Sequence, residues 1–203
     1  MGVTRGFQAY VPVRRRLFRC ARHAGPPAPD SGRRTLAGAG GPAYGGVLKN
    51  RIEFEIVRAD SALFFQLFSA VRAEELGMQD WQPELRATIL RFQFTAQAHG
   101  YRERFPAADY RLILRGGRPI GWLIVDRSGP ALHCVDIAVA PEERRKGAGT
   151  DALRALQEEA AARDQAVVLT VLRTNGGALA LYCRLGFQVT SEDDLHATME
   201  WRR

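Results

Sequence analysis

Hydrophobic and polar residues follow two different periods in the first half of the chain. Residues 52–59 alternate, which predicts a half-buried strand. Asp60 is a candidate N-cap for a helix from Ala62 to about Leu76, and Pro83 suits the first position of a second helix that continues through residue 105. In this second helix, one face is formed by Leu85, Ile89, Phe92 and Ala96.

The second half of the chain has the pattern of a sheet. Residues 109–115 and 119–126 are strand-like and are joined by a tight turn, and 132–139 predict a third strand. An amphipathic helix through 150–164 precedes the apolar run 166–173, which is typical of a central strand covered on both faces. A short helix and two short strands complete a mixed α/β sheet.

Net charge is unevenly distributed along the 203 residues. The chain carries +7, but residues 1–50 hold eight Arg and one Lys against one Asp, or +8, so the remainder sums to −1. Residues 1–50 are also rich in Gly and Pro, which predicts a disordered basic leader. A targeting segment and an upstream start codon are the alternatives. We expect one domain over residues 51–203, near neutral and therefore without a nucleic-acid surface of its own.

The three cysteines, Cys20, Cys134 and Cys183, are scattered and form no C-x-x-C pair. This spacing argues against a structural zinc site and a disulfide framework, and it suits a reducing compartment. No apolar run approaches the roughly 20 residues that span a bilayer. We therefore expect a cytoplasmic protein with no metal and no membrane contact, either a monomer or a homodimer.

The stretch "APEERRKGAGT", residues 140–150, places three cations before two glycines at the start of a helix. A helix start has unpaired N–H groups and a partial positive charge, and glycine lets an anion approach the backbone closely. The combination suits a pyrophosphate. A dinucleotide fingerprint is the main alternative, but only 54 residues follow Gly149, too few for the rest of a doubly wound sheet. A solvated basic turn is the other.

A second segment, "NGGALALYCRLGF", begins 26 residues after Gly149. Together the two segments resemble motifs of the GNAT superfamily of N-acetyltransferases. Arg144-x-x-Gly147-x-Gly149 matches Q/R-x-x-G-x-G/A, and the second segment matches N-x-x-A-x-x-L-Y-x-x-x-G-F from Asn175 to Phe187. The resemblance implies a mostly antiparallel sheet flanked by helices, with a splayed central strand pair at the site of acetyl-CoA.

The resemblance also implies roles for individual residues. Backbone groups of Ile137 and Val139 would bind the pantetheine, backbone amides of residues 145–150 the pyrophosphate, and Asn175 the carrier. Tyr182 would protonate the departing thiolate, although an inward-packed aromatic is the structural alternative. The full set of implied cofactor-binding residues is Ile137, Ala138, Val139, Arg144, Arg145, Lys146, Gly147, Ala148, Gly149, Thr150, Asn175 and Tyr182.

The general base is not evident from the motifs. His133 and Asp136 on the strand before the cationic loop are candidates, and strict alternation places them on opposite faces, His133 with Val135. Without a base, an α-amine with a pKa near 8 is favoured over lysine, because about a tenth of it is neutral at pH 7. We therefore expect a primary amine acceptor, a small molecule or a peptide α-amine.

The two helices after the first strand are expected to cover the acceptor. In the second, Phe94, Gln97 and Tyr101, with Gln93 beside them, are either the wall of an amine pocket or an ordinary inner helix face. Two other functions stay open: an inactive acetyl-CoA-binding sensor or interaction module of the same fold, and nucleic-acid binding through residues 1–49.

Overall fold

The structure is a computed structural model, and it describes residues 52–203. The expectations for residues 1–50 lie outside the described residues. The predicted order of elements is confirmed: β1 (Ile52–Val57), α1 (Ala62–Glu75), α2 (Pro83–Arg104), β2 (Asp109–Arg115), β3 (Arg118–Asp126), β4 (Leu132–Val139), the 3-10 turn η1 (Pro141–Glu143), α3 (Ala148–Ala162), β5 (Val167–Leu172), α4 (Gly176–Arg184), β6 (Gln188–Glu192) and β7 (His196–Trp201).

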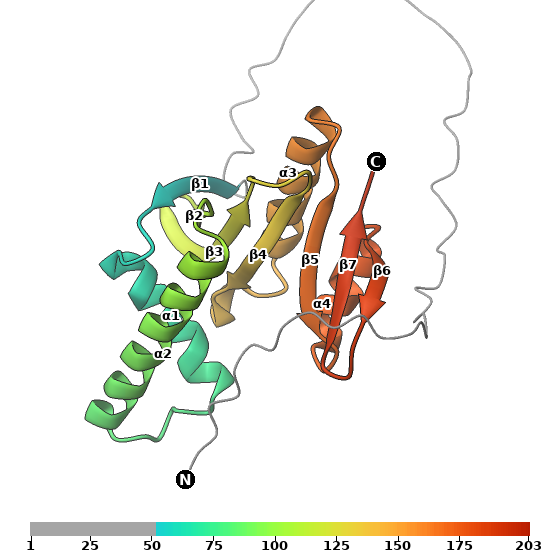
Figure 1. The fold of residues 1–203 in the computed structure, drawn as a ribbon. Helices are drawn as coiled ribbons and strands as arrows, with labels where there is room; N and C mark the ends of the chain where they lie inside the picture. Colours follow the sequence, from blue (N-terminus) through green and yellow to red (C-terminus); the bar gives the residue numbers. More distant parts are fainter. Residues whose placement is uncertain (1–51) are drawn as a thin grey trace, which may run out of the picture.

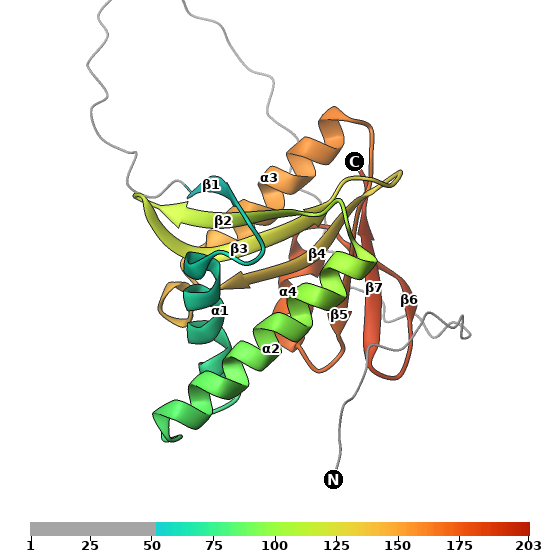
Figure 2. The ribbon, with the colours of Figure 1, turned by 60° about the vertical axis from the view of Figure 1, so that its left-hand side comes forward.

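The strands form one seven-stranded sheet in the order β1-β2-β3-β4-β5-β7-β6. Every neighbouring pair is antiparallel except β4 and β5. Helices α1 and α2 cover one face and α3 and α4 the other (Figures 1 and 2). Two large apolar clusters follow from this layering, one on each side of the sheet, and a small third one joins α1 to α2. The predicted mixed, mostly antiparallel α/β architecture is confirmed.

The parallel pair β4–β5 separates after three residues. Leu132, His133 and Cys134 pair with residues 167–169, and the remainder of the two strands has no partner across the gap. Figure 1 shows the two strands diverging toward the ends from which η1 and α4 follow. The predicted splay of the central strand pair is thus confirmed. It leaves one backbone edge of β4, residues 135–139, without a neighbouring strand.

A β-bulge in β4 overturns the predicted facing of its side chains. Cys134 pairs with Val125 and Asp136 with Ile124, so Val135 is an extra residue without an opposite partner. The extra residue shifts the alternation by one position. His133 and Asp136 therefore lie on the same face, toward α2, and not on opposite faces. A bulge leaves no mark in a hydrophobic pattern, which is why strict alternation failed.

The face of α2 formed by Leu85, Ile89, Phe92 and Ala96 is not its main packing face, although Ile89 packs partly against the small cluster of Ala73, Met78 and Leu90. Phe92 is 70% exposed and Leu85 52% exposed, whereas Leu90 is buried. The half-buried residues that face inward include Phe94, Gln97 and Tyr101, which is compatible with an inner helix face and with the wall of a pocket. Helix α2 has apolar residues on two faces, and periodicity alone does not say which of them meets the sheet.

The N-cap of α1 also differs from the expectation by one residue. The hydroxyl of Ser61 accepts a hydrogen bond from the Phe64 N–H at 3.2 Å. Asp60 forms an ion pair with Arg58 at 3.0 Å instead. Both residues are good N-caps, and the path of the chain out of β1 decides between them.

Gly121 of β3 lies where β3 and β4 approach most closely. A Cβ atom there would lie 2.4 Å from the carbonyl oxygen of Ala138. This contact involves backbone at the centre of the sheet, so no side-chain rotation relieves it.

We expect Gly121→Ala to lower the free energy of unfolding by about 1–3 kcal/mol or more through overpacking. The control is Gly100→Ala, because that helical position has open space around it. There alanine should add about 1 kcal/mol through helix propensity. Urea denaturation of both variants measures the difference, and a Gly121→Ala variant as stable as wild type would contradict the close approach.

Candidate active site

The two sequence motifs meet beside the opening between β4 and β5. Gly149 stands in the first turn of α3, and the position of its missing Cβ is 3.7 Å from the Leu181 side chain and 3.9 Å from that of Val139. Leu181 precedes Tyr182 on α4, and Val139 ends β4. One glycine therefore brings the cationic loop, the end of the unpaired strand and the tyrosine helix together.

The start of α3 has the geometry of an anion site. Its N-cap is Gly147 with φ +89°, and no side chain caps the helix. The N–H groups of Ala148, Gly149 and Thr150 are therefore without helical acceptors. Arg145 has φ +59°, a left-handed conformation that is uncommon for residues other than glycine. This backbone turns the loop into the helix and leaves the amide groups of its first turn without internal acceptors.

The three cations of the loop differ in their partners. Arg144 turns to α1, where it pairs with Glu74 at 2.6 Å, and its Nε donates to the carbonyl of Val139 at 3.1 Å. Lys146 pairs with Glu143 at 3.4 Å. Within residues 52–203, the side chain of Arg145 alone of the three makes no hydrogen bond or ion pair. Arg145 is therefore the cation of the loop that is available to an anionic ligand.

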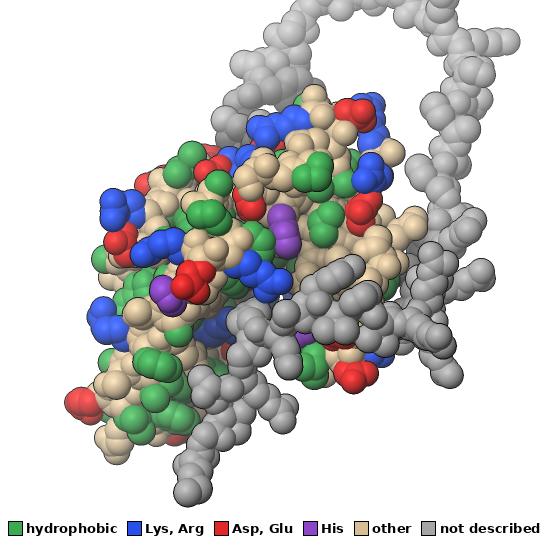
Figure 3. Space-filling view, viewed as in Figure 1, with side chains coloured by type: hydrophobic (Ala, Val, Ile, Leu, Met, Phe, Trp, Pro, Cys, Tyr) green, Lys and Arg blue, Asp and Glu red, His purple; other side chains and the backbone are tan. Residues whose placement is uncertain are grey.

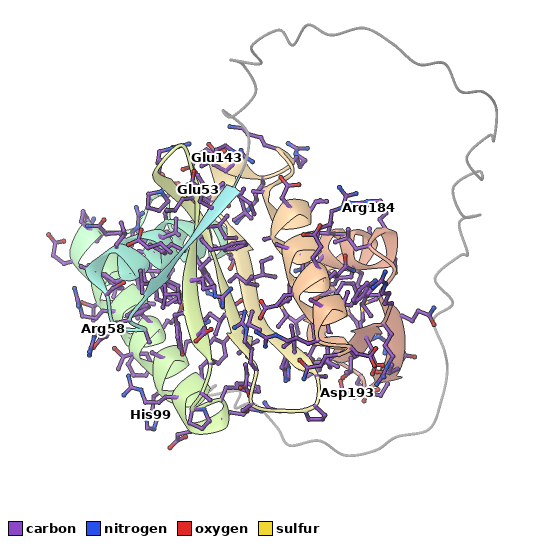
Figure 4. The ribbon with its side chains drawn as sticks, turned by 90° about the horizontal axis from the view of Figure 1, so that it is seen from above. Glu53, Arg58, His99, Glu143, Arg184 and Asp193 are labelled. Carbon is purple, nitrogen blue, oxygen red and sulfur yellow. The ribbon has the colours of Figure 1, made fainter. Side chains whose placement is uncertain are left out.

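Glu143 anchors the loop and was not singled out by the sequence. Its side chain, 6% exposed, pairs with Arg115 at 2.8 Å and also with Arg118 and Lys146. Burial favours its neutral form, but Lys146 and Arg118 outweigh that effect and hold the pKa of Glu143 below its ordinary value. Figure 4 shows Glu143 at the edge of the molecule where Glu53 of β1 also lies. The ion pairs fasten the loop to the β2–β3 hairpin.

Tyr182 lies at the inner end of the opening, on the α3–α4 face of the sheet. It is buried, and its ring packs against Phe187 with centroids 5.7 Å apart. Burial raises the pKa of its phenol, and the nearby Cys134 and Asp136 raise it further. The phenol is therefore protonated at neutral pH and is a hydrogen donor. The position of Tyr182 is compatible both with a packing role and with a role as proton donor.

Asp136 lies on the opposite, α2-facing side of β4. One oxygen, Oδ2, accepts hydrogen bonds from Gln97 Nε2 at 2.9 Å and from Trp122 Nε1 at 3.0 Å. No ion pair within residues 52–203 includes Asp136. Burial raises the pKa of its carboxyl, while the two hydrogen bonds and the charge of Arg72 oppose the rise. A carboxylate without a cationic partner in such surroundings is typical of a functional site.

His133 lies on the same face as Asp136 but in a different environment. Its ring packs edge-on against Phe105, with centroids 4.8 Å apart. Burial lowers the pKa of His133, and the charge of Arg104 lowers it further, so the imidazole is neutral at pH 7. His133 stands where β4 still pairs with β5, whereas Asp136 stands beyond the point of separation. Of the two, only Asp136 affects the pKa of Tyr182.

The remaining predicted residues lie around the same opening. The side chain of Asn175 accepts from the Ala178 N–H at 3.1 Å, so it is the N-cap of α4. Ile137 and Val139 point to the α3–α4 side and Ala138 to the α1–α2 side. The structure thus brings together the predicted residues of β4, the loop, α3 and α4, with His133 set back along β4.

The opening suits a long anionic ligand with an amide-containing arm. The uncapped α3 terminus and Arg145 offer donors to phosphate, and the free edge of β4 offers backbone groups to an amide. Residues 52–203 hold no group of three or more His, Cys, Asp or Glu side chains placed to bind a metal ion. In the same part of the chain, every helix is too short or too polar to span a membrane.

Replacing Asp136 by asparagine should stabilise the fold at neutral pH. The folded state raises the pKa of this carboxyl, so keeping it ionised costs free energy above the ordinary value of 3.8, and that cost disappears as the pH falls below it. Asparagine keeps an acceptor for Gln97 and Trp122 without the charge. The free energy of unfolding of Asp136→Asn should therefore exceed that of wild type at pH 7 and converge with it near pH 4.

Urea denaturation across this pH range is the measurement, and Asp80→Asn, at an exposed position before α2, is the control. A variant less stable than wild type at pH 7 would mean that Asp136 is a structural ion.

Comparison with known proteins agrees with this geometry. Residues 72–187 match the model of the acetyltransferase (GNAT) family. Among solved structures, a PaiA N-acetyltransferase from Thermoplasma acidophilum in complex with coenzyme A is 14% identical, with a TM-score of 0.56 over 75% of this chain and 99% of that one. An acetyltransferase from Thermus thermophilus is 15% identical, with a TM-score of 0.56 over 77% of this chain and 100% of the other.

A GNAT family acetyltransferase from Elizabethkingia anophelis with acetyl-CoA bound is 15% identical, with a TM-score of 0.52 over 76% and 100% of the two chains. No curated protein sequence matches the chain. At these identities the structures show a shared fold, and the family model covers more than half of the chain. The chain belongs to the GNAT family of acetyltransferases.

Proposed function

We propose that this protein is an N-acetyltransferase that moves the acetyl group of acetyl-CoA to a primary amine by direct attack in a ternary complex. One observation carries the proposal: a protonated tyrosine and an unpaired carboxylate approach the β4–β5 opening from its two sides, beside an uncapped helix N-terminus. Such an opening lets a donor and an acceptor meet from opposite faces of the sheet. The family membership supports acyl transfer in general.

The donor side of the site is formed by β4, the loop and α3. The backbone amides of α3 and the side chain of Arg145 bind the pyrophosphate, and backbone groups of Ile137 and Val139 bind the pantetheine arm. Acetyl-CoA supplies the activated thioester. Arg144 contributes through its backbone, because its side chain is held by Glu74. The ammonium group of Lys146 is paired with Glu143, so it attracts the pyrophosphate more weakly than Arg145 does.

The chemistry requires two proton movements. The amine nitrogen attacks the acetyl carbonyl, so a C–N bond forms and the C–S bond breaks. Asp136 accepts the proton that the nitrogen loses, and Tyr182 donates its proton toward the departing sulfur. A thiol with a pKa near 8.5 is a good leaving group, so a phenol hydrogen bond is sufficient help.

Asp136 is a better candidate for the base than His133. Burial raises its pKa, which makes the carboxylate more basic than an ordinary aspartate. It stands beyond the point where β4 leaves β5, whereas His133 is packed against Phe105. A carboxylate at this place also attracts an ammonium ion. This attraction fits the acceptor proposed here, a primary amine on a small molecule or at the α-position of a peptide.

Isothermal titration of the full chain with acetyl-CoA tests the donor site. We expect micromolar binding, with no binding of NADPH as the negative control. Arg145→Gln should weaken binding about 10-fold by removing a charged donor. Arg58→Gln, the control, should change it by less than about 3-fold, because this exposed arginine lies between β1 and α1 and pairs with Asp60, outside the donor site. Absent binding, or a preference for NADPH, would end the proposal.

Tyr182→Phe tests the acid. We expect kcat for acetylation to fall about 10²–10⁴-fold, because a positioned acid is lost, with an unchanged Kd for acetyl-CoA. The assay follows thiol release with a panel of small primary amines and short peptides. Tyr110→Phe is the control, because the hydroxyl of this buried tyrosine has no hydrogen-bond partner. A wild-type protein that binds acetyl-CoA but acetylates none of the amines would indicate the sensor alternative.

A further inference from the structure

Helix α2 exposes an apolar face to solvent. Phe92 and Leu85 are 70% and 52% exposed and Ala96 on the same side is exposed as well, with the polar Thr88, Thr95, His99 and Glu103 around them. Figure 3 shows hydrophobic side chains gathered over the part of the molecule that α2 occupies in Figure 1. The opposite side of the helix packs inward through Leu90, against Ala73 and Met78, and through Phe94. A helix that is apolar on two sides is normally covered on both.

We propose that this face is a self-interface, on which α2 packs antiparallel against α2 of a second copy of this chain. Phe92 lies near the middle of Pro83–Arg104. A two-fold axis at this position brings Phe92 against its own copy, and such aromatic pairs are favourable. It also sets Leu85 opposite His99 of the second copy, between Ala96 and Gly100. These small residues allow two helix backbones to approach closely.

Charge complementarity selects a second copy over other partners. Glu84 is the acidic residue of the first turn of α2, and Arg102 is a basic residue of the last. They are 18 residues apart, or about five helical turns, so they lie on one line along the helix. In an antiparallel pair with a two-fold axis, the same line of both helices meets. Glu84 of each copy then faces Arg102 of the other, on both sides of the Phe92 pair.

Sedimentation equilibrium of the full chain between 1 and about 100 µM is the first test. We expect a dimer that dissociates in the micromolar range, because a single helix face is smaller than a standard interface. Phe92→Glu should weaken it about 100-fold or more, because it removes a central aromatic and places two like charges together. Leu195→Glu is the control: this leucine is 59% exposed in the β6–β7 turn, away from α2, and its replacement should leave the dimer unchanged.

A charge exchange tests the antiparallel two-fold arrangement. Glu84→Arg and Arg102→Glu should each weaken the dimer about 3- to 10-fold, because each turns both attractive pairs into repulsive ones. The double variant should restore it. Restoration is specific to an arrangement in which these two residues meet across the axis.

Cross-linking tests the register. Phe92→Cys should form a disulfide dimer under oxidised glutathione, whereas His99→Cys should not, because two copies of residue 99 would lie about 21 Å apart along the helices. The unsubstituted chain controls for the native cysteines. A wild-type monomer at 100 µM, a dimer unaffected by Phe92→Glu, or equal cross-linking of the two cysteine variants would overturn the proposal. None of these outcomes depends on acetyl-CoA binding or turnover.

Discussion

The separation of β4 from β5 is the constraint on which the site depends. Parallel strands that part after three residues leave backbone donors and acceptors unpaired in the middle of a sheet, and such groups need partners. Arg144 supplies one by donating to the carbonyl of Val139. The rest of the edge of β4 is available to a ligand, and the first turn of α3 stands beside it. Because the fold leaves these backbone groups of β4 without a strand partner, they can bind a ligand.

Two carboxylates near this opening illustrate opposite solutions to the cost of burying charge. Glu143 is surrounded by Arg115, Arg118 and Lys146, which keep it ionised, so it is a structural anchor. Asp136 has hydrogen bonds but no ion pair, so burial raises its pKa. The first arrangement stabilises the loop. The second retains a reactive group, and natural proteins commonly give up some stability at functional sites.

The cationic loop is less positive than its sequence suggests. Three consecutive cations suggest one positive mouth. In the structure, Arg144 and Lys146 are neutralised by glutamates from α1 and η1, and Arg145 has no such partner. These glutamates are as much as 70 residues distant in the sequence. Spacing within a motif carries no information about which distant acids come to meet it.

The sequence by itself determined the order of elements, the mixed α/β sheet and the two motifs, because periodicity, glycines and helix starts act over a few residues. The splay of the central strands was expected only from the resemblance to a known family. Only the tertiary structure decided the facing of His133 and Asp136, since a bulge depends on the fit between β3 and β4. It also decided which apolar face of α2 meets the sheet, because both faces satisfy the helical period, and the contacts of Phe94 with α1 and of Gln97 with Asp136 of β4 select one. Short motifs identified the residues of the site, whereas contacts between elements distant in the sequence determined which side chains these residues meet.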